Sequence, residues 1–167
     1  MLPVAILCGG HGTRANLPIN KCFIQVGNKP FILHQMEYME SFGYDTFVLC
    51  RGTGGTLTAL RNARDQLGER FIVLYGDTLL KLDYNDFISR WDHVATPAIV
   101  AMYDKIDAGV NGISGWMLDM LDDDVTDFAT LRDEARTRLM THHYQAPRRY
   151  LDVGTPEELA ITKKALT

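Results

Sequence analysis

The fold of this chain is decided by Leu7-Cys8-Gly9-Gly10-His11-Gly12-Thr13-Arg14, in which three glycines and an arginine directly follow an apolar segment. Residues 3–8 form that segment, a continuous apolar run typical of a buried parallel strand. Small residues let backbone N–H groups close around phosphate oxygens, and an arginine binds such oxygens with its fork of donors. We therefore expect a buried strand that ends in a phosphate-binding loop.

Two other kinds of phosphate loop can be compared with this stretch. Residues 10–15 satisfy G-x-G-x-x-A, the fingerprint of a Rossmann dinucleotide site, in which a helix begins within the motif. Here Asn16-Leu17-Pro18 follows, and we expect loop and short strand as far as Pro30, which disfavours that site. A Walker A loop is excluded because no Gly-Lys-Ser/Thr follows at the required spacing.

Segments of strand and helix character alternate along the rest of the chain. Apolar runs predict strands at 46–50, 71–75 and 98–103, and apolar residues at helical spacing predict helices at 31–42, 56–67 and 84–91. The C-terminal third is less regular, with an apolar segment at 116–121, and it predicts a helix at about 128–140, a strand ending near Val153, and a last helix capped by Thr155. This alternation predicts an α/β fold, with one mostly parallel, doubly wound sheet in a single domain over residues 1–167.

Composition excludes several classes of partner. The chain has 167 residues, with 17 Lys and Arg against 21 Asp and Glu, so it lacks the basic footprint that binds polymeric nucleic acid. No apolar run approaches the roughly 20 residues of a membrane span, and residues 2–8 lack the flanks of a signal peptide, so we expect no membrane association and a cytoplasmic location. The three cysteines are widely spaced and are expected to be small core residues.

Several blocks of the chain together resemble the sugar-1-phosphate nucleotidyltransferases. The family signature of strand-G-G-x-G-T-R, a Pro-Lys pair and a G-x-K-P turn corresponds to residues 9–14, Asn20-Lys21 and Gly27-Asn28-Lys29-Pro30. Further along, the family's L-G-T-G-G, N-G-D-T and D-x-G-T-P-E blocks correspond to residues 51–56, 74–78 and 150–157. Asn20 and Cys22 depart from the pattern, because prolines usually flank the lysine. The opening motif and the G-T-G-G loop lean toward the heptose-1-phosphate guanylyltransferase or cytidylyltransferase side of the family.

The resemblance implies that an oxygen of a sugar 1-phosphate attacks the α-phosphorus of a nucleoside triphosphate and that pyrophosphate leaves, giving an NDP-sugar. The resemblance points to GTP or CTP with a heptose or hexose 1-phosphate as the substrates. Such a step needs charge neutralisation and in-line positioning more than proton transfer. Arg14 and Lys21 are the candidate catalytic residues, which would stabilise the leaving phosphates.

The same resemblance assigns residues to a magnesium ion and to both substrates. Asp77 and Asp152 each lie where a strand ends, and two such carboxylates with phosphate oxygens could hold one Mg²⁺. Alternatively, Asp77 is an ordinary turn residue and Asp152 a cap near the final helix. The nucleotide-binding candidates come from the two glycine loops, and they are Leu7, Gly9, Gly10, Gly12, Thr13, Gly52, Thr53 and Gly54.

The sugar side of this chain departs most from the family. Cys50 is followed almost at once by Gly52, so a helix and strand present in relatives are missing. Lys105, Asn111 and Gly112 are the candidate counterparts of the family's sugar-phosphate residues, a Glu-Lys pair and an Asn-Gly-Gly turn. The missing segments leave a sheet edge less covered than in relatives, and a second copy of the chain in a homo-oligomer could cover it.

Two alternative functions remain open. A molybdenum-cofactor-type nucleotidyltransferase has the same fold and ends in a similar T-P-E-E-L helix, but its loop normally reads G-G-x-S-x-R-M-G, unlike Gly12-Thr13-Arg14. A shortened, catalytically weak member of the family could instead bind nucleotide as a regulatory module. Turnover with any sugar 1-phosphate would exclude the second alternative.

Overall fold

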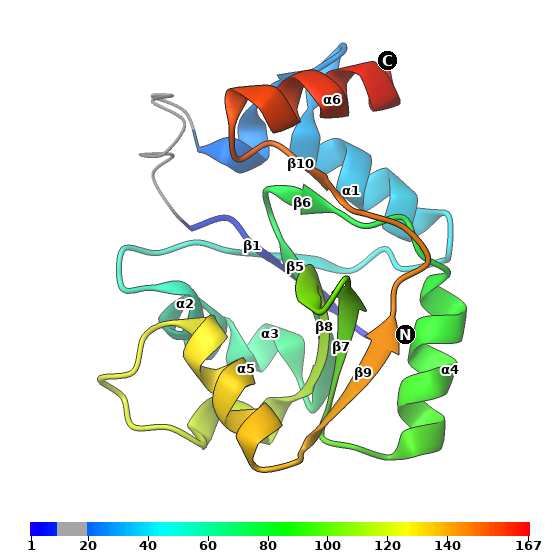
Figure 1. Cartoon of the computed structure of the whole chain (residues 1–167). Helices are drawn as coiled ribbons and strands as arrows, with labels where there is room; N and C mark the ends of the chain where they lie inside the picture. Colours follow the sequence, from blue (N-terminus) through cyan, green and yellow to red (C-terminus); the bar gives the residue numbers. More distant parts are fainter. Residues whose placement is uncertain (10–19) are drawn as a thin grey trace.

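A six-stranded, mostly parallel sheet forms the centre of the molecule (Figure 1). The computed structural model describes residues 1–9 and 20–167. The strand order is β4-β1-β5-β8-β7-β9, and β8 alone runs antiparallel to its two neighbours. The predicted α/β fold class, a mostly parallel sheet covered by helices, is therefore confirmed.

The helices and strands follow the alternation that the sequence predicts. Among the described residues, no helix combines the length and the apolar character needed to cross a membrane. In chain order the elements are β1 Val4–Leu7, η1 Lys21–Phe23, β2 Gln25–Val26, β3 Lys29–Pro30, α1 Phe31–Glu40, β4 Phe47–Cys50, α2 Thr56–Asn62, α3 Arg64–Leu67, β5 Arg70–Tyr75, β6 Thr78–Leu79, α4 Tyr84–Val94, β7 Ala98–Tyr103, β8 Ile106–Ser114, η2 Gly115–Asp119, α5 Phe128–Thr137, β9 Thr141–Gln145, β10 Leu151–Asp152 and α6 Pro156–Leu166.

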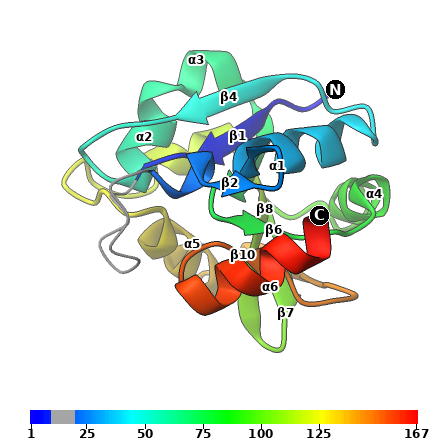
Figure 2. The ribbon, with the colours of Figure 1, turned by 90° about the horizontal axis from the view of Figure 1, so that it is seen from above.

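Helices cover both faces of the sheet because successive strand residues point to opposite sides (Figures 1 and 2). On one face, Val4 and Ile6 of β1 pack in a core with residues of α1 and α4, including the fully buried Trp91. On the other face, Ala5 and Leu7 pack in a core with residues of α2, α3 and α5. The chain is thus doubly wound around its sheet.

A smaller layer lies over the carboxyl end of the parallel strands. There β10 pairs with β6, and α6 packs against β10 and β2, around a small apolar core that contains Val26, Phe31 and Val153. Figure 2 shows α6 and β10 crossing above the sheet. Thr155 caps α6 by accepting a hydrogen bond from the backbone N–H of Glu158 at 3.2 Å, and Pro156 begins the helix, as the sequence predicts.

The region 104–114 differs from the prediction. Asp104 and Lys105, both with positive φ, form the turn of a hairpin between β7 and β8. The expected sugar-facing turn at 110–112 is wrong, because these residues lie inside β8, where Asn111 pairs with Val73 and with Val100. The sequence around Gly109 and Gly112 contains too many small residues for apolar alternation to reveal a buried strand.

A single arginine holds the long connection between β8 and α5. The guanidinium of Arg61, on α2, donates hydrogen bonds to the backbone carbonyls of Leu118 at 2.9 Å, Leu121 at 2.7 Å and Val125 at 3.0 Å. The same connection meets the start of α2, where the carbonyl of Thr126 accepts from the backbone N–H of Leu57. Arg61 therefore fixes a segment that borders the glycine loop before α2.

We expect Arg61→Lys to lower the free energy of unfolding by about 2–4 kcal/mol, because one ammonium group cannot replace a planar fork that bonds several carbonyls. Urea denaturation checks this value. Arg64→Lys is the matched control, since Arg64 is 44% exposed in its ion pair with Asp119 and its replacement should cost less than about 1 kcal/mol. Equal losses in the two variants would contradict the structural role of Arg61.

Candidate active site at the carboxyl edge of the sheet

The ends of β1, β4 and β5 bring the two glycine loops together. Leu7 pairs with Cys50 on one side and Tyr75 on the other, and the backbone N–H of Cys8 donates to the carbonyl of Cys50 at 2.9 Å. A Cβ on Gly9 would lie only 3.6 Å from the carbonyl oxygen of Gly52. The predicted nucleotide segments are therefore neighbours, and the loop continues through Thr53 and Gly54 into α2. Gly10, Gly12, Thr13 and Arg14 lie outside the described residues.

Lys21 and Asp77 meet at this edge although 56 residues separate them in the chain. The Nζ atom of Lys21 lies 3.2 Å from Oδ2 of Asp77. The side chains are 21% and 34% exposed, so both are half-buried yet remain open to solvent. The predicted catalytic lysine and the first predicted metal ligand thus share one site.

Asp152 reaches the same place through the pairing of β10 with β6. Asp152 is opposite Thr78, and the backbone N–H of Val153 donates to the carbonyl of Asp77 at 3.1 Å. Burial raises the pKa of Asp152; the backbone N–H of Gly154, which donates to this carboxylate, opposes the shift, and the charge of Asp77 adds to it. The charge of Lys21 lowers the pKa of Asp152, so the ionised form of this buried carboxylate depends on cations beside it.

Asn20 fixes the position of Lys21 through two hydrogen bonds. Its side-chain amide donates to the carbonyl of Cys8, at the end of β1, and its carbonyl accepts from the backbone N–H of Cys22 at 3.1 Å. Asn20 therefore caps η1 and ties it to β1, which fixes the backbone of Lys21 from both sides.

Gly76 has no side chain, and this lets the end of β5 lie close to the end of β1 and to η1. Its backbone N–H donates to the carbonyl of Leu7 at 3.1 Å, and a Cβ at this position would collide with that oxygen, at 2.6 Å, and with Sγ of Cys22. Any side chain here would push β5 away from β1 and η1. The glycine that precedes Asp77 is therefore a packing requirement as well as part of a motif.

Gln35 supports the turn that carries Asp77. It was not identified from the sequence as a site residue. The side chain lies on α1 and is 1% exposed, and its amide donates to the carbonyls of Tyr75 at 2.8 Å and Thr78 at 2.6 Å. These two carbonyls lie on either side of Gly76-Asp77, so Gln35 fixes the turn that carries the carboxylate. The signal available in the sequence was a polar residue at a position that helical spacing places on the buried face of the predicted helix 31–42.

The donor set at this edge fits a magnesium ion that is completed by substrate. Asp77 and Asp152 supply hard carboxylate oxygens, and Mg²⁺ usually takes one or two carboxylates together with phosphate oxygens and water. Within the described part of the chain, no group of three or more His, Cys, Asp or Glu residues could hold a metal alone. Such a pair therefore suits an ion that arrives with a phosphate ligand.

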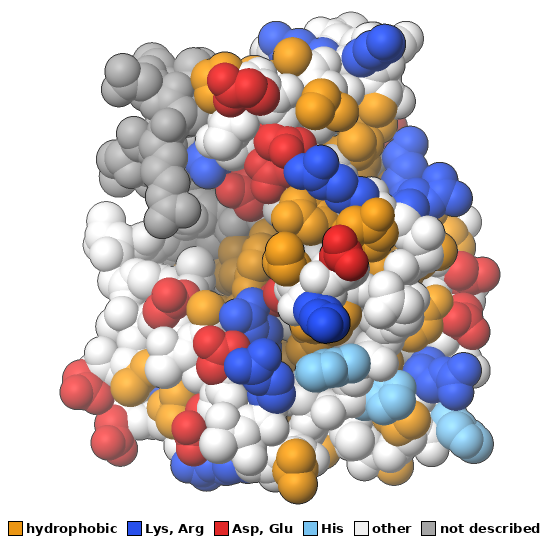
Figure 3. All heavy atoms as spheres, in the orientation of Figure 1, with side chains coloured by type: hydrophobic (Ala, Val, Ile, Leu, Met, Phe, Trp, Pro, Cys, Tyr) orange, Lys and Arg blue, Asp and Glu red, His pale blue; other side chains and the backbone are white. Residues whose placement is uncertain are grey.

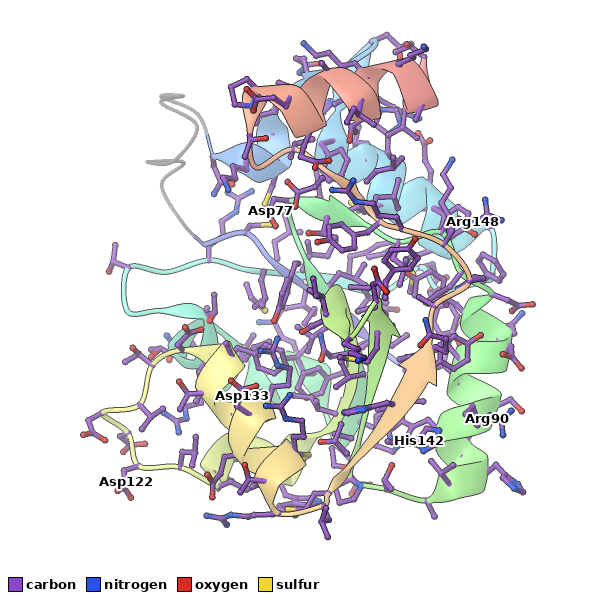
Figure 4. The ribbon with its side chains drawn as sticks, in the orientation of Figure 1. Asp77, Arg90, Asp122, Asp133, His142 and Arg148 are labelled. Carbon is purple, nitrogen blue, oxygen red and sulfur yellow. The ribbon has the colours of Figure 1, made fainter. Side chains whose placement is uncertain are left out.

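A cavity, which we call the α5 cavity, lies beside this edge. It has a volume of about 430 Å³ and lies between β5, the β7–β8 hairpin, α5 and β9, with Tyr75, Lys105, Asp107, Arg132, Arg136 and His143 in its wall. Basic and histidine side chains gather over these elements in the middle of the molecule in Figure 3. In Figure 4, Asp77 is labelled near the upper end of β5 and Asp133 on α5 below it.

A hydrogen-bonded cluster forms one wall of the α5 cavity. The hydroxyl of Tyr75 donates to Asp107 at 3.0 Å, and Arg132 donates to both of these side chains. The carboxylate of Asp107 is 9% exposed and also accepts from the backbone N–H of Gly109. Burial, reinforced by the charge of Asp107, raises the pKa of Tyr75, so this phenol stays protonated at neutral pH. The cluster is a rigid wall rather than a group of free bases.

The three predicted sugar-phosphate residues are placed differently from one another. Lys105 lines the α5 cavity. Asn111 is fully buried on the face shared with Val100, and its Oδ1 has no hydrogen-bond partner within the described structure. Gly112 is not brought to the cavity, because it lies on the opposite face, where a Cβ would be 2.7 Å from the ring of Trp91.

Comparison with known proteins shows a shared fold without close sequence similarity. No protein-family model and no curated protein matches the sequence. Crystal structures of HddC from Yersinia pseudotuberculosis are similar over 100% of both chains, with 20% sequence identity and a TM-score of 0.82, or 0.85 for the complex with GMP-PN. A putative glucose-1-phosphate thymidylyltransferase from Bacillus anthracis, in complex with a sucrose, matches 99% of this chain and 95% of its own, with 14% identity and a TM-score of 0.77.

We expect Gln35→Leu to lower the free energy of unfolding by about 2–4 kcal/mol, because two buried carbonyls lose their donor. Urea denaturation provides the measurement, and Gln66→Leu on the exposed surface of α3 is the control, with a change within about 0.5 kcal/mol. If Gln35→Leu proved as stable as the control variant, the two hydrogen bonds would not support the Asp77 turn.

Proposed function

We propose that this protein is a nucleotidyltransferase that transfers a nucleoside monophosphate from a nucleoside triphosphate to a sugar 1-phosphate. The observation that carries the proposal is the convergence of Lys21, Asp77 and Asp152 beside the two glycine loops. In an open α/β sheet, the crevice at the carboxyl ends of the strands is where ligands bind.

The reaction requires little proton transfer from the protein. An anionic oxygen of the sugar 1-phosphate forms a bond to the α-phosphorus, the bond from that phosphorus to the β-phosphate oxygen breaks, and pyrophosphate leaves with the electron pair. Lys21 then neutralises charge on the phosphates, and Arg14 is proposed to act with it. Mg²⁺ held by Asp77 and Asp152 would supply further charge neutralisation and orient the phosphates.

The two substrates fit different parts of this edge. The loop after β1 and the loop at 52–54 are proposed to hold the nucleotide, because their glycines leave backbone groups open to close approach. HddC, which has the same fold, was solved with GMP-PN, a guanine nucleotide analogue, and this supports GTP as the first choice.

The α5 cavity is proposed to receive the sugar. It adjoins the edge through Tyr75, two residues before Asp77, and its wall carries polar side chains, among them Asp107, Thr141 and His143. A wall with several hydrogen-bonding side chains favours a ligand rich in hydroxyl groups. The Bacillus anthracis protein of the same fold was solved with a sucrose, which supports a sugar ligand for this fold.

We expect GTP, and alternatively CTP, to raise the melting temperature of the protein in the presence of Mg²⁺, because a ligand that binds only the native state stabilises it. Thermal denaturation with each of the five common triphosphates tests this. No shift with any triphosphate would contradict the nucleotide site.

Asp77→Asn should reduce Mg²⁺-dependent release of pyrophosphate by roughly 100-fold or more, because it removes one of two proposed ligands. The assay combines the stabilising triphosphate with sugar 1-phosphates, and Asp123→Asn, at an exposed carboxylate, is the control. Near-normal turnover of the Asp77→Asn variant would contradict the role of Asp77 as a metal ligand. A wild-type protein that binds nucleotide but turns over no sugar 1-phosphate would instead be a binding module.

A further inference from the structure

Two basic side chains of the α5 cavity lack an acidic partner among residues 1–9 and 20–167. Three basic and two acidic side chains line the cavity, and Arg132 engages both acidic ones, Asp107 and Asp133. Lys105 and Arg136 form no ion pair with any residue that the structure describes. In a chain with a net charge of −4, this local surplus of positive charge favours an anionic ligand.

These two side chains lie toward opposite ends of the cavity. Lys105 is in the turn between β7 and β8. Because β8 runs antiparallel to β5 with Val110 opposite Leu74, this turn lies at the same end of the sheet as Asp77. Helix α5 starts near that edge, where the ring of Phe128 packs edge-on against Tyr75 at 6.4 Å, and runs away from it. The chain after α5 reaches the far end of β7, where the carbonyl of Met140 accepts from Ala98. Arg136 lies one helical turn beyond Arg132, about 6 Å farther from the edge.

The cavity is also longer than one sugar ring. Thr141 and Met102 both line it, and Thr141 pairs with Ala98, four residues before Met102 on β7. Four residues of strand correspond to about 13 Å. A pyranose ring placed near His143 would therefore leave space between itself and Arg136, which a further substituent could fill.

We propose that the sugar acceptor carries a second acidic group, a carboxylate or a phosphate, on the part of the sugar remote from the anomeric phosphate, and that Arg136 binds it. The inference rests on the proposed function, because it assigns the anomeric phosphate to the end of the cavity near Lys105 and Asp77. A guanidinium suits this role because its fork matches both a carboxylate and a phosphate.

The test compares three acceptors that differ only at carbon 6: glucose 1-phosphate, glucuronic acid 1-phosphate and glucose 1,6-bisphosphate. The mannose series is treated likewise, and kcat/KM is measured for each with the stabilising triphosphate. We expect at least one charged acceptor to exceed its neutral counterpart roughly tenfold, and the two charged compounds distinguish a carboxylate from a phosphate.

Arg136→Gln should reduce the preference for the charged acceptor roughly five- to tenfold. Arg138→Gln is the matched control, because Arg138 directly follows α5, is 51% exposed and is bonded to Glu134. This variant should keep the wild-type preference. Efficient use of neutral acceptors with no effect of Arg136→Gln on the ratio would overturn the inference and leave the proposed function intact. Absence of turnover with every acceptor would reject the proposed function and this inference together.

Discussion

The contact between Gly76 and the end of β1 is the constraint on which the site depends. Its backbone N–H bonds the carbonyl of Leu7, and the missing Cβ leaves space for the thiol of Cys22. This contact brings the turn that carries Asp77 to within ion-pair distance of Lys21, which directly precedes Cys22. A larger residue at position 76 would separate these two charged groups.

Around this contact, the site is assembled by polar residues that bond backbone rather than ligand. Gln35 fixes the carbonyls on either side of Gly76-Asp77, and Asn20 ties η1 to β1. Buried carbonyls that lack a donor cost free energy, so each of these side chains selects one backbone arrangement. The charged groups are thus held by a neutral framework, which places Lys21, Asp77 and Asp152 together at the carboxyl edge of the sheet.

The α5 cavity is bounded by a hydrogen-bonded wall. The β7–β8 hairpin and α5 form a wall in which Tyr75, Asp107 and Arg132 bond one another. Because Arg132 is already engaged with two carboxylates, its charge is compensated, whereas Lys105 and Arg136 have no such partner within the described residues. The uncompensated positive charge of the cavity therefore comes from Lys105 and Arg136 rather than from the Tyr75–Asp107–Arg132 cluster.

The sequence by itself determined the order of strands and helices, the glycine loops and the capped last helix, because apolar periodicity and turn chemistry are local properties. It also indicated Lys21, Asp77 and Asp152, through motifs in one order along the chain. It did not determine strand β8, where small residues hide the alternation, and so it predicted a turn where Asn111 and Gly112 lie within a strand. Only the tertiary structure decided which residues meet, as Gln35 meets the Asp77 turn and Arg136 meets the α5 cavity, since such contacts join positions far apart in the chain.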